Sequence, residues 1–398
     1  MKPIRLAYLL SHPIQYQAPL LKAIAAQPDI DLSVFYESDL SVGAFHDREF
    51  NREIAWDVRL LDGYRHQFLR PSAPLRPREL PNLWRPRGSE IVKLLRAQRF
   101  DALWVHGYMA IEHWRALGAA RAAGTKTLLR DEANATSSQR HRLKDAIKPY
   151  LFRRLDRSID AYLAIGAANA AYYAALGVAA DKIHPMPYAV DNRWFRARIL
   201  EAGQSRQRLR AALGIAPDAL VVLSAAKLLA RKRPLDLLEA FLKADSKEAA
   251  LLYAGDGEMA ETIRARLDAD EKRVRLLGFQ SQAQMAALYD LADVMVLPSE
   301  RESWGLVVNE AMNGACAIVV SDRVGAGLDL VREGENGAVF PVGDITALGA
   351  ILRDLLTHRE RLAAMGEASL RIVAEWSFAQ DIAGLRAALH AVLPDRPG

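Results

Sequence analysis

Short runs of hydrophobic residues alternate with longer amphipathic segments along the whole chain. We predict strands at these runs, which lie at 4–10, 32–36, 102–106, 126–130 and 161–166 in the first half and at 219–225, 250–255, 274–278, 293–298 and 317–322 in the second. Helical periodicity fills intervals such as 18–27, 89–98 and 110–123. Alternating strands and helices are typical of βαβ units with parallel sheets. The pattern therefore predicts an α/β protein with two doubly wound, Rossmann-like domains.

The stretch 184–195, HPMPYAVDNRWF, carries two prolines and a polar turn, so we predict the connection between the domains there. The expected domains are 1–190 and 191–375, followed by a last helix within 376–398 that packs back on the first domain. Two domains suit 398 residues, because single hydrophobic cores stop growing at about 250–300 residues. Two facing domains would leave a cleft, and ligands of open α/β sheets bind beyond the carboxyl ends of the strands.

The composition is that of an ordinary globular chain, with 51% hydrophobic and 25% charged residues, which argues against long disorder. The single cysteine, Cys316, excludes an intramolecular disulfide framework and a cysteine-cluster zinc site. No stretch approaches the roughly 18 uninterrupted apolar residues of a membrane helix, and the first apolar run is too short for a secretory signal. We therefore expect a cytoplasmic protein.

The net charge of +5 is unevenly distributed, because residues 1–190 contain 27 basic and 19 acidic residues and the remainder 26 and 29. Much of the excess lies in 70–90 and 137–157, and the second stretch predicts a helix with Leu143, Ile147, Leu151 and Leu155 on one face. Such a helix either lies on the inner face of an anionic membrane or packs on the core with a solvated basic face. No recognisable nucleic-acid-binding module accompanies the charge, so we expect no nucleic-acid partner.

The most informative stretch is DVMVLPSERESWGLVVNEAMNGACAIVVSD, residues 293–322. A buried-type strand is followed by a polar loop and by a helix whose free N–H groups favour an anion such as phosphate. Gly305 would let the backbone approach that anion closely. Glu302 in the loop and Glu310 in the helix would accept hydrogen bonds from hydroxyls, so the two features together indicate a sugar nucleotide. Alternatively, the glutamates are a capping residue and an exposed helix residue.

A second group of charges, in VVLSAAKLLARKRPLDLLEAF (221–241), follows the first strand of the second domain. Lys227 lies at the strand's end, and Lys232 lies in the loop before a helix that opens at Pro234. A cation 4 Å from a phosphate oxygen gains about 1 kcal/mol in water and up to about 4 near a protein surface, against about 0.3–1 for a helix terminus. Two lysines would therefore dominate the binding of a diphosphate; the alternative is a solvated basic loop.

Together, these motifs resemble the nucleotide-binding half of the retaining glycosyltransferases of family four, which have the GT-B fold. The likeness covers about 219–375 and rests on Lys-Leu-x-x-x-Lys from Lys227, on LLYAGDGEM (251–259), on the stretch from 274 to 322 and on VREGENGAVFPVGD (331–344). It implies transfer of a sugar from a nucleotide donor to an acceptor hydroxyl, with retention of anomeric configuration, in glycan, glycolipid or polysaccharide synthesis.

By position, the resemblance places Lys227 and Lys232 on the diphosphate, Glu302 near the hydroxyls of the donor sugar and Glu310 on the ribose. Ser303 and Trp304 stand where the family has glycine and phenylalanine, and the donor-binding set ends with Gly305, Leu306 and Val307, which match. The expected donor is a UDP- or GDP-sugar, and no cofactor or metal is expected. We take Glu302, His106 and Lys232 as the catalytic candidates.

The first half resembles the family less specifically. His106 ends a strand where family members often place a histidine near the donor sugar, although a histidine at a strand end is also a common structural hydrogen-bonder. The usual glycine-rich loop after the first strand is replaced by SHPIQYQAP, in which Gln15 and Tyr16 would have to supply contacts. Arg130, Asp131 and Glu132 also follow a strand, and for these we favour a structural role.

Two Asp-x-Asp sequences, at 29–31 and 268–270, have the form of a metal-binding motif of another glycosyltransferase fold, but both lie in predicted turns away from the site. Three rival functions remain open. A glycoside hydrolase could use the glutamate pair, a non-catalytic subunit could bind a sugar nucleotide, and an epimerase could share the fold. The acceptor is expected to be a hydroxyl compound, lipid-linked or anionic.

Overall fold

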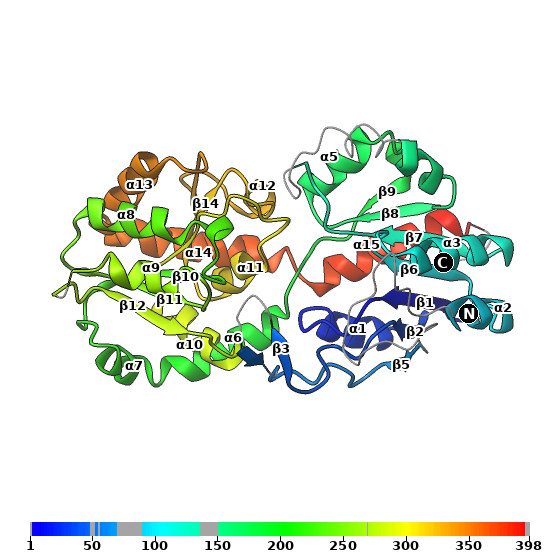
Figure 1. Cartoon of the computed structure of the whole chain (residues 1–398), viewed down its shortest axis with the longest axis horizontal. Helices are drawn as coiled ribbons and strands as arrows, with labels where there is room; N and C mark the ends of the chain where they lie inside the picture. Colours follow the sequence, from blue (N-terminus) through cyan, green and yellow to red (C-terminus); the bar gives the residue numbers. More distant parts are fainter. Residues whose placement is uncertain are drawn as a thin grey trace. The chain divides into compact units, whose positions relative to one another are not determined.

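The structure is a computed structural model that describes residues 2–47, 52–54, 56–69, 90–135, 150–268 and 270–394. The chain divides into two compact units (Figure 1). Unit 1 comprises Met1–Phe45, Glu53–Tyr188 and Phe378–Gly398, and unit 2 comprises His46–Arg52 and Ala189–Ser377. The main connections therefore lie at Tyr188 and at Ser377, so the last helix of the chain belongs to unit 1.

Unit 1 is built on a parallel sheet with the strand order β5-β2-β1-β6-β7-β8-β9. The strands are β1 (Ile4–Leu10), β2 (Ile30–Tyr36), β5 (Arg65–Phe68), β6 (Ala102–His106), β7 (Lys126–Arg130), β8 (Ala161–Ala164) and β9 (Ile183–Pro185). The helices are α1 (Ala18–Ala25), α2 (Glu90–Ala97), α3 (Ile111–Ala122), α5 (Ala167–Ala175), the 3-10 turn η1 (Ala180–Lys182) and α15 (Phe378–Val392). A separate two-stranded ribbon joins β3 (Phe45–Asp47) to β4 (Arg52–Ile54).

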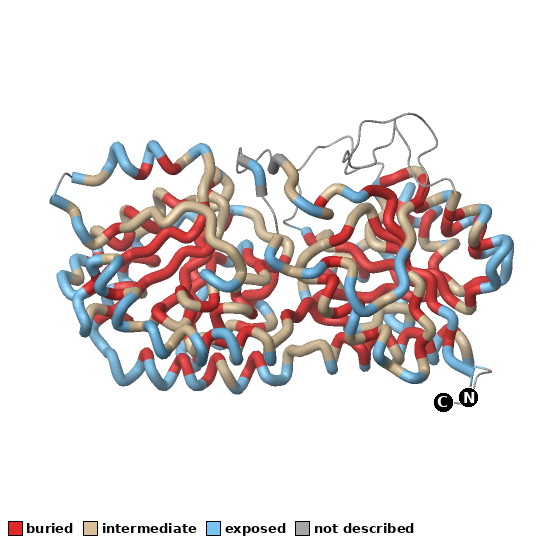
Figure 2. The backbone as a smooth tube through the Cα atoms, turned by 90° about the horizontal axis from the view of Figure 1, so that it is seen from below, coloured by how far each residue is buried: buried red, intermediate tan, exposed pale blue. Residues whose placement is uncertain are grey.

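Helices cover both faces of the unit 1 sheet because side chains on each strand point alternately to opposite sides. On β1, Leu6 and Tyr8 join a hydrophobic cluster with α1 and α15, whereas Ala7 and Leu9 join a second cluster with α2, α3 and α5. The strands are buried on both sides, as Figure 2 shows for the central strands of both units. This explains why they read as nearly continuous apolar runs in the sequence.

Unit 2 repeats this design with a parallel sheet in the order β12-β11-β10-β13-β14-β15. The strands are β10 (Leu220–Ala225), β11 (Ala249–Ala254), β12 (Val274–Gly278), β13 (Val294–Leu297), β14 (Ala317–Ser321) and β15 (Gly337–Phe340). The helices are α6 (Asn192–Gly203), α7 (Arg206–Ala212), the 3-10 turn η2 (Ala230–Lys232), α8 (Pro234–Ala244), α9 (Ala260–Ala265), α10 (Gln282–Leu291), α11 (Leu306–Asn313), α12 (Gly327–Leu330), α13 (Ile345–Thr357) and α14 (Arg359–Ala374).

Local sequence signals set where the unit 2 helices begin. Helix α8 opens on Pro234, whose fixed φ suits a first turn. Helix α10 opens on a capping box in which the Ser281 hydroxyl accepts from the backbone of Gln284 and the Gln284 side chain accepts from the backbone of Ser281. Helices α8 and α13 lie on one side of the sheet and α6 and α10 on the other (Figure 1). The predicted fold class, two doubly wound α/β domains, is confirmed.

All ten predicted strands are present, with ends within about two residues of the expected ones, but β3, β4, β5, β9 and β15 were not predicted. The predicted basic helix lies partly outside the described residues, and its described part is helical over 150–156. There Phe152 and Leu155 are buried, whereas Leu151 is 48% exposed, so Leu151 and Leu155, which were expected on one face, differ in burial. Among the described residues, no helix is both long enough and apolar enough to cross a bilayer.

Candidate functional site

The strand order of unit 2 reverses between β10 and β13, and open α/β sheets bind ligands at the carboxyl ends of the strands at such a switch point. The loop after β10 carries Lys227 and Lys232, and the loop after β13 carries Glu302. Helix α11 follows directly and carries Glu310. The fold thus gathers the predicted donor-binding residues at one edge of unit 2, while His106 lies in unit 1.

Lys232 and Glu302 form a direct ion pair between Nζ and Oε2, with side chains that are 13% and 18% exposed. The pair joins the loop after β10 to the loop after β13, and the backbone bond from Glu300 N–H to the Arg231 carbonyl (2.8 Å) supports the same junction. In the structure, the positive charge of Lys232 is therefore balanced by the negative charge of Glu302. Binding of a diphosphate by Lys232 therefore requires the ammonium to be shared with, or released by, Glu302.

Gly305 precedes helix α11 and adopts a left-handed conformation, with φ +97°. A Cβ at this position would lie 3.0 Å from Leu297 Cδ2 and 3.2 Å from Val324 Cγ1, so both the backbone angle and the packing favour glycine. Among the residues that the structure describes, the backbone N–H groups of Leu306 and Val307 have no acceptor. Two N–H groups at a helix N-terminus can bind an anion such as a phosphate.

The loop before α11 is held by the segment after β14. Glu302 N–H donates to the Arg323 carbonyl (3.2 Å), and Gly325 N–H donates to the Glu302 carbonyl (3.1 Å). Ala326 N–H donates to the Trp304 carbonyl (2.9 Å). A Cβ on Gly325 would overlap the Ser303 carbonyl oxygen, so this close approach also needs glycine. The loop is therefore held in place on one side by backbone hydrogen bonds.

Trp304 is 3% exposed, and its ring stacks on Trp376 with centroids 5.6 Å apart and planes 18° apart. Its indole N–H donates to Asn309 Oδ1 at 2.8 Å. The indole is therefore part of the core of unit 2. The neighbouring Ser303 is half-buried.

The loop that carries Lys227 is pinned by the GDG sequence after β11. Leu228 N–H donates to the Asp256 carbonyl (2.9 Å), and Met259 N–H donates back to the Leu228 carbonyl (2.9 Å). Gly257 has φ +152°, and a Cβ there would lie 2.6 Å from the Leu228 carbonyl oxygen. The glycine-rich motif thus positions the Lys227 loop by direct backbone packing.

Glu310 is half-buried on α11, and its Oε2 accepts a hydrogen bond from the Tyr289 hydroxyl of α10 at 2.6 Å. Burial raises the pKa of Glu310 to about 7, although the bond from Tyr289 acts in the opposite direction. Near neutral pH, both the acid and the carboxylate are therefore populated. The sequence did not single out Tyr289, because it lies 21 residues before Glu310 and only the fold brings its hydroxyl to the carboxylate.

In unit 1 the strand order reverses between β1 and β6, and His106 is the last residue of β6. Its Nδ1 lies 3.2 Å from the Tyr8 hydroxyl, which itself donates to Gln17 Oε1 at 2.7 Å. The Gln17 amide nitrogen lies 3.5 Å from Nδ1 and 3.4 Å from Nε2. Burial, aided by the Arg130 cation, lowers the pKa of His106 to about 3, so the ring is neutral.

The three residues after β7 differ sharply in their surroundings. The Arg130 guanidinium is buried and donates to Asp381 Oδ1 (3.0 Å) and to the Met186 carbonyl (2.8 Å). Asp131 is also buried and accepts from Ala133 N–H (2.9 Å), and burial raises its pKa to about 6. The side chain of Glu132 is instead 42% exposed and lies beside His106. Arg130 and Asp131 thus contact neighbouring protein groups in the interior, whereas the Glu132 side chain is also open to solvent.

The loop after β1 contacts both His106 and Glu132. The Tyr16 hydroxyl donates to Glu132 Oε1 at 2.7 Å, and Gln17, rather than Gln15, contacts His106. Within the described part of the chain, the half-buried Gln15 side chain makes no hydrogen bond. In the first Asp-x-Asp sequence, Asp29 lies in a turn and is bound by Arg386 at 2.6 Å, whereas Asp31 lies in β2 and pairs with Arg65, so predicting a turn at Asp31 was wrong. The middle residue of the second sequence, 268–270, lies outside the described residues.

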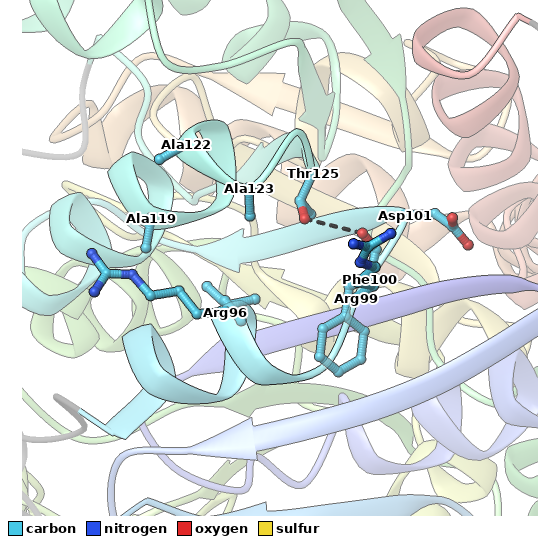
Figure 3. A pocket seen from close by; sticks show the side chains of 9 residues that line it. Arg96, Arg99, Phe100, Asp101, Ala119, Ala122, Ala123 and Thr125 are labelled. Atoms are coloured by element: carbon cyan, nitrogen blue, oxygen red, sulfur yellow. Dashed lines mark hydrogen bonds between the residues drawn. The ribbon is translucent and has the colours of Figure 1, made fainter.

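A cavity of about 600 Å³ lies on unit 1 near the amino-terminal ends of β6 and β7. Figure 3 shows that Arg96, Arg99, Asp101 and Thr125 line it together with small side chains of α3. These residues precede the strands or lie at the ends of α2 and α3, so the cavity is at the edge opposite to His106. It contains no residue of the predicted site.

Residues 205–371 match the family model described as glycosyl transferases group 1. This segment belongs to that family. The group 1 segment spans the whole unit 2 sheet and includes Lys227, Lys232, Glu302 and Glu310.

Among curated relatives, N-acetyl-alpha-D-glucosaminyl L-malate synthase of Bacillus anthracis is 32% identical over 170 residues, covering 42% of this chain and 44% of the relative. D-inositol 3-phosphate glycosyltransferase of Thermomonospora curvata is 33% identical over 207 residues, covering 47% of each. The chain thus spans about half the length of the curated relatives it matches.

Solved structures match over nearly the whole chain. HepE of Anabaena in complex with UDP has a TM-score of 0.73 at 17% identity, covering 98% of this chain and all of that one. A glycosyltransferase from Rickettsia africae has a TM-score of 0.75 at 12% identity, with both chains fully covered. These matches show that unit 1 and the group 1 segment share the two-domain fold of these proteins.

Proposed function

We propose that the protein is a retaining glycosyltransferase that moves a sugar from a nucleotide-diphosphate donor to an acceptor hydroxyl. One observation carries this proposal. In the group 1 segment, the Lys232–Glu302 pair and the N-terminus of α11, whose first N–H groups lack acceptors among the described residues, both follow strands at the point where the strand order reverses. One edge of one sheet thereby offers cations and N–H groups for phosphate next to carboxylates for hydroxyls. A sugar nucleotide presents both kinds of group.

The proposed donor is a UDP- or GDP-sugar. Support for UDP comes from the similar folds of HepE, whose structures were determined with UDP and with UDP-glucose. In our assignment, Lys227, Lys232 and the N–H groups of Leu306 and Val307 hold the diphosphate. Glu310 accepts hydrogen bonds from the ribose, and Glu302 accepts them from the sugar.

In the proposed reaction the acceptor oxygen forms a bond to the anomeric carbon while the bond from that carbon to the diphosphate oxygen breaks. The electron pair goes to the diphosphate, and the acceptor's proton passes to a leaving phosphate oxygen. Lys227, Lys232 and the α11 terminus stabilise the negative charge that develops on this leaving group, which is differential binding of the transition state. These groups supply the positive charge in our scheme, and we assign no metal.

We further propose a peripheral contact between unit 1 and an anionic membrane surface through the segment 150–157. Tyr150 is 70% and Leu151 is 48% exposed, and Arg153, Arg154 and Arg157 are exposed beside them. Exposed apolar side chains between arginines suit an interfacial helix. Such a contact would bring a lipid-linked acceptor to the enzyme, and sedimentation with vesicles of anionic and neutral lipid would test it.

The central experiment is a thermal-shift screen of UDP-, GDP-, ADP- and dTDP-sugars on the full chain, followed by assay of the best donor with hydroxyl acceptors. A ligand at about 100 times its Kd stabilises the folded state by about 2.7 kcal/mol, which raises the Tm of a unit of this size by several degrees. Lys232→Ala should lose most of that shift and most transfer, whereas the exposed Lys243→Ala should lose neither. No shift with any nucleotide, or full turnover by Lys232→Ala, would refute the assignment.

A further inference from the structure

A chain of polar side chains crosses the carboxyl edge of the unit 1 sheet and ends in a histidine and a glutamate that face each other. His106 Nε2 and Glu132 Oε1 are 3.9 Å apart, too far for a hydrogen bond between them. Their side chains are 13% and 42% exposed, so both can be reached from outside. Because His106 is neutral, this contact is not an ion pair.

The hydrogen bonds of His106 fix which ring nitrogen carries the proton. The Tyr8 hydroxyl gives its single proton to Gln17 Oε1, so its oxygen accepts from His106 Nδ1–H. In this tautomer Nε2 has a lone pair and is an acceptor. The Gln17 amide reaches it only at 3.4 Å, a weak bond that leaves room for a stronger donor.

The carboxylate of Glu132, like the His106 ring, is held in place by hydrogen bonds to neighbouring side chains. The hydroxyls of Tyr16 and Tyr188 both donate to Oε1 at 2.7 Å, and the two rings meet edge to face with centroids 5.6 Å apart. Within the described residues, no donor contacts Oε2. The two tyrosines therefore hold one oxygen and leave the other to accept hydrogen bonds from a ligand.

Two acceptor side chains that approach within 3.9 Å of each other require two donors. We propose that His106 Nε2 and the Glu132 carboxylate bind two neighbouring hydroxyls of one sugar ring, a vicinal diol. A single hydroxyl has one proton and can satisfy only one of the acceptors. A phosphate or carboxylate ligand brings no proton and is repelled by Glu132. The pair thus selects a neutral polyol.

This inference rests on the proposed function, and it gives Glu132 a direct contact with substrate in place of the structural role expected from the sequence. The diol has two possible sources, the sugar of the donor and the acceptor. Both present the same chemistry to His106 and Glu132, so the experiment has one arm for each.

The test compares the full chain with Glu132→Gln, whose amide keeps one oxygen for the two tyrosines and replaces the other acceptor with a donor. Free glucose, galactose, mannose and inositol are titrated by saturation-transfer NMR without nucleotide, alongside 2-deoxyglucose and 3-deoxyglucose. The wild type should bind a vicinal diol, and Glu132→Gln should bind it about tenfold to a hundredfold more weakly. The exposed Glu53→Gln is the matched control and should bind as the wild type does.

In the second arm, the KM for hydrolysis of UDP-glucose rises in Glu132→Gln if the pair holds the donor sugar and stays constant if it holds the acceptor. On the deoxy sugar that lacks the contacted hydroxyl, the substitution should cause no further loss, because the interaction is already absent. Equal sugar binding by wild type and Glu132→Gln, or no binding of any diol by the wild type, would overturn the inference. Failure of the wild type to bind either UDP or GDP would instead count against the proposed function, since the nucleotide is assigned to unit 2.

Discussion

The Tyr289 hydroxyl of α10 donates a hydrogen bond of 2.6 Å to Oε2 of Glu310 on α11. The bond ties the carboxylate assigned to the ribose to a neighbouring helix, while burial raises the pKa of Glu310 to about 7. Protonation of this one group is therefore linked to the stability of unit 2 and, under the proposed ribose assignment, to nucleotide affinity in the same pH range.

Replacing Glu310 with glutamine should change the pH dependence of stability. Because the folded pKa is raised above the ordinary 4.5, the charged form destabilises the native state, and the stability of the wild type should fall as pH rises from about 4.5 to about 7. Glu310→Gln should be more stable than the wild type at pH 8, by an amount on the order of 1–3 kcal/mol, and equal to it at pH 4.5. Thermal melts of both proteins at both pH values measure this difference, and the exposed Glu201→Gln serves as the control. The prediction would be contradicted if the stability of Glu310→Gln changed with pH in the same way as that of the wild type does.

Gly305→Ala should both destabilise unit 2 and weaken nucleotide binding. The substitution forces a side chain into a left-handed angle and against Leu297 at 3.0 Å, with an expected cost of about 2–4 kcal/mol. Gly334 also has positive φ, +74°, but its surroundings are open, so Gly334→Ala should cost only about 1–2 kcal/mol. Tm and affinity for the best nucleotide are the readouts. Equal behaviour of the two variants would show that crowding at Gly305 is unimportant.

Trp304→Phe should lower stability without abolishing donor binding. The phenyl ring can still pack on Trp376 but loses the indole hydrogen bond to Asn309, a loss of about 1–2 kcal/mol. Nucleotide affinity should fall less than threefold, because the indole is buried away from the loop surface. Thermal melts and nucleotide titrations test this. A large loss of affinity in a well-folded variant would mean that the ring itself contacts the donor.

Removing Asp381 should destabilise unit 1 strongly. Asp381 and Arg130 are both buried, and deleting one partner of a buried pair costs about 3–5 kcal/mol. The control is the ion pair between Arg386, on the same helix as Asp381, and the partly exposed Asp29, so Asp29→Ala should cost at most about 1 kcal/mol. Denaturant unfolding followed by tryptophan fluorescence compares the two, and similar midpoints would contradict the expected difference.

Strands such as β10 and β13 could be predicted because burial on both faces makes them almost entirely apolar, a signal that is local in sequence. The strands β5, β9 and β15 are edge strands of their sheets, are short, and carry polar residues, proline or glycine in RHQF, IHP and GAVF. Their position depends on the neighbouring strand rather than on their own pattern. No local rule could have marked them.

In the candidate site, too, residues in a local sequence motif could be predicted, whereas contacts between distant residues could not. Lys232 and Glu302 could be selected because each follows a strand in a recognisable motif, yet their direct pairing spans 70 residues and appears only in the fold. Tyr8, Gln17 and Tyr289 were missed because an isolated tyrosine or glutamine carries no pattern that reports its partner. The roles assigned to the site residues, and the cleft expected between the domains, stay predictions.

Helix α15 completes the core of unit 1 although it is the last helix of the chain, and the residues of unit 2 intervene. During synthesis, unit 2 is therefore available to fold before Asp381 can reach Arg130. Until then the face of the sheet at β8 and β9 that α15 covers remains exposed to solvent, and closing it depends on the residues of α15.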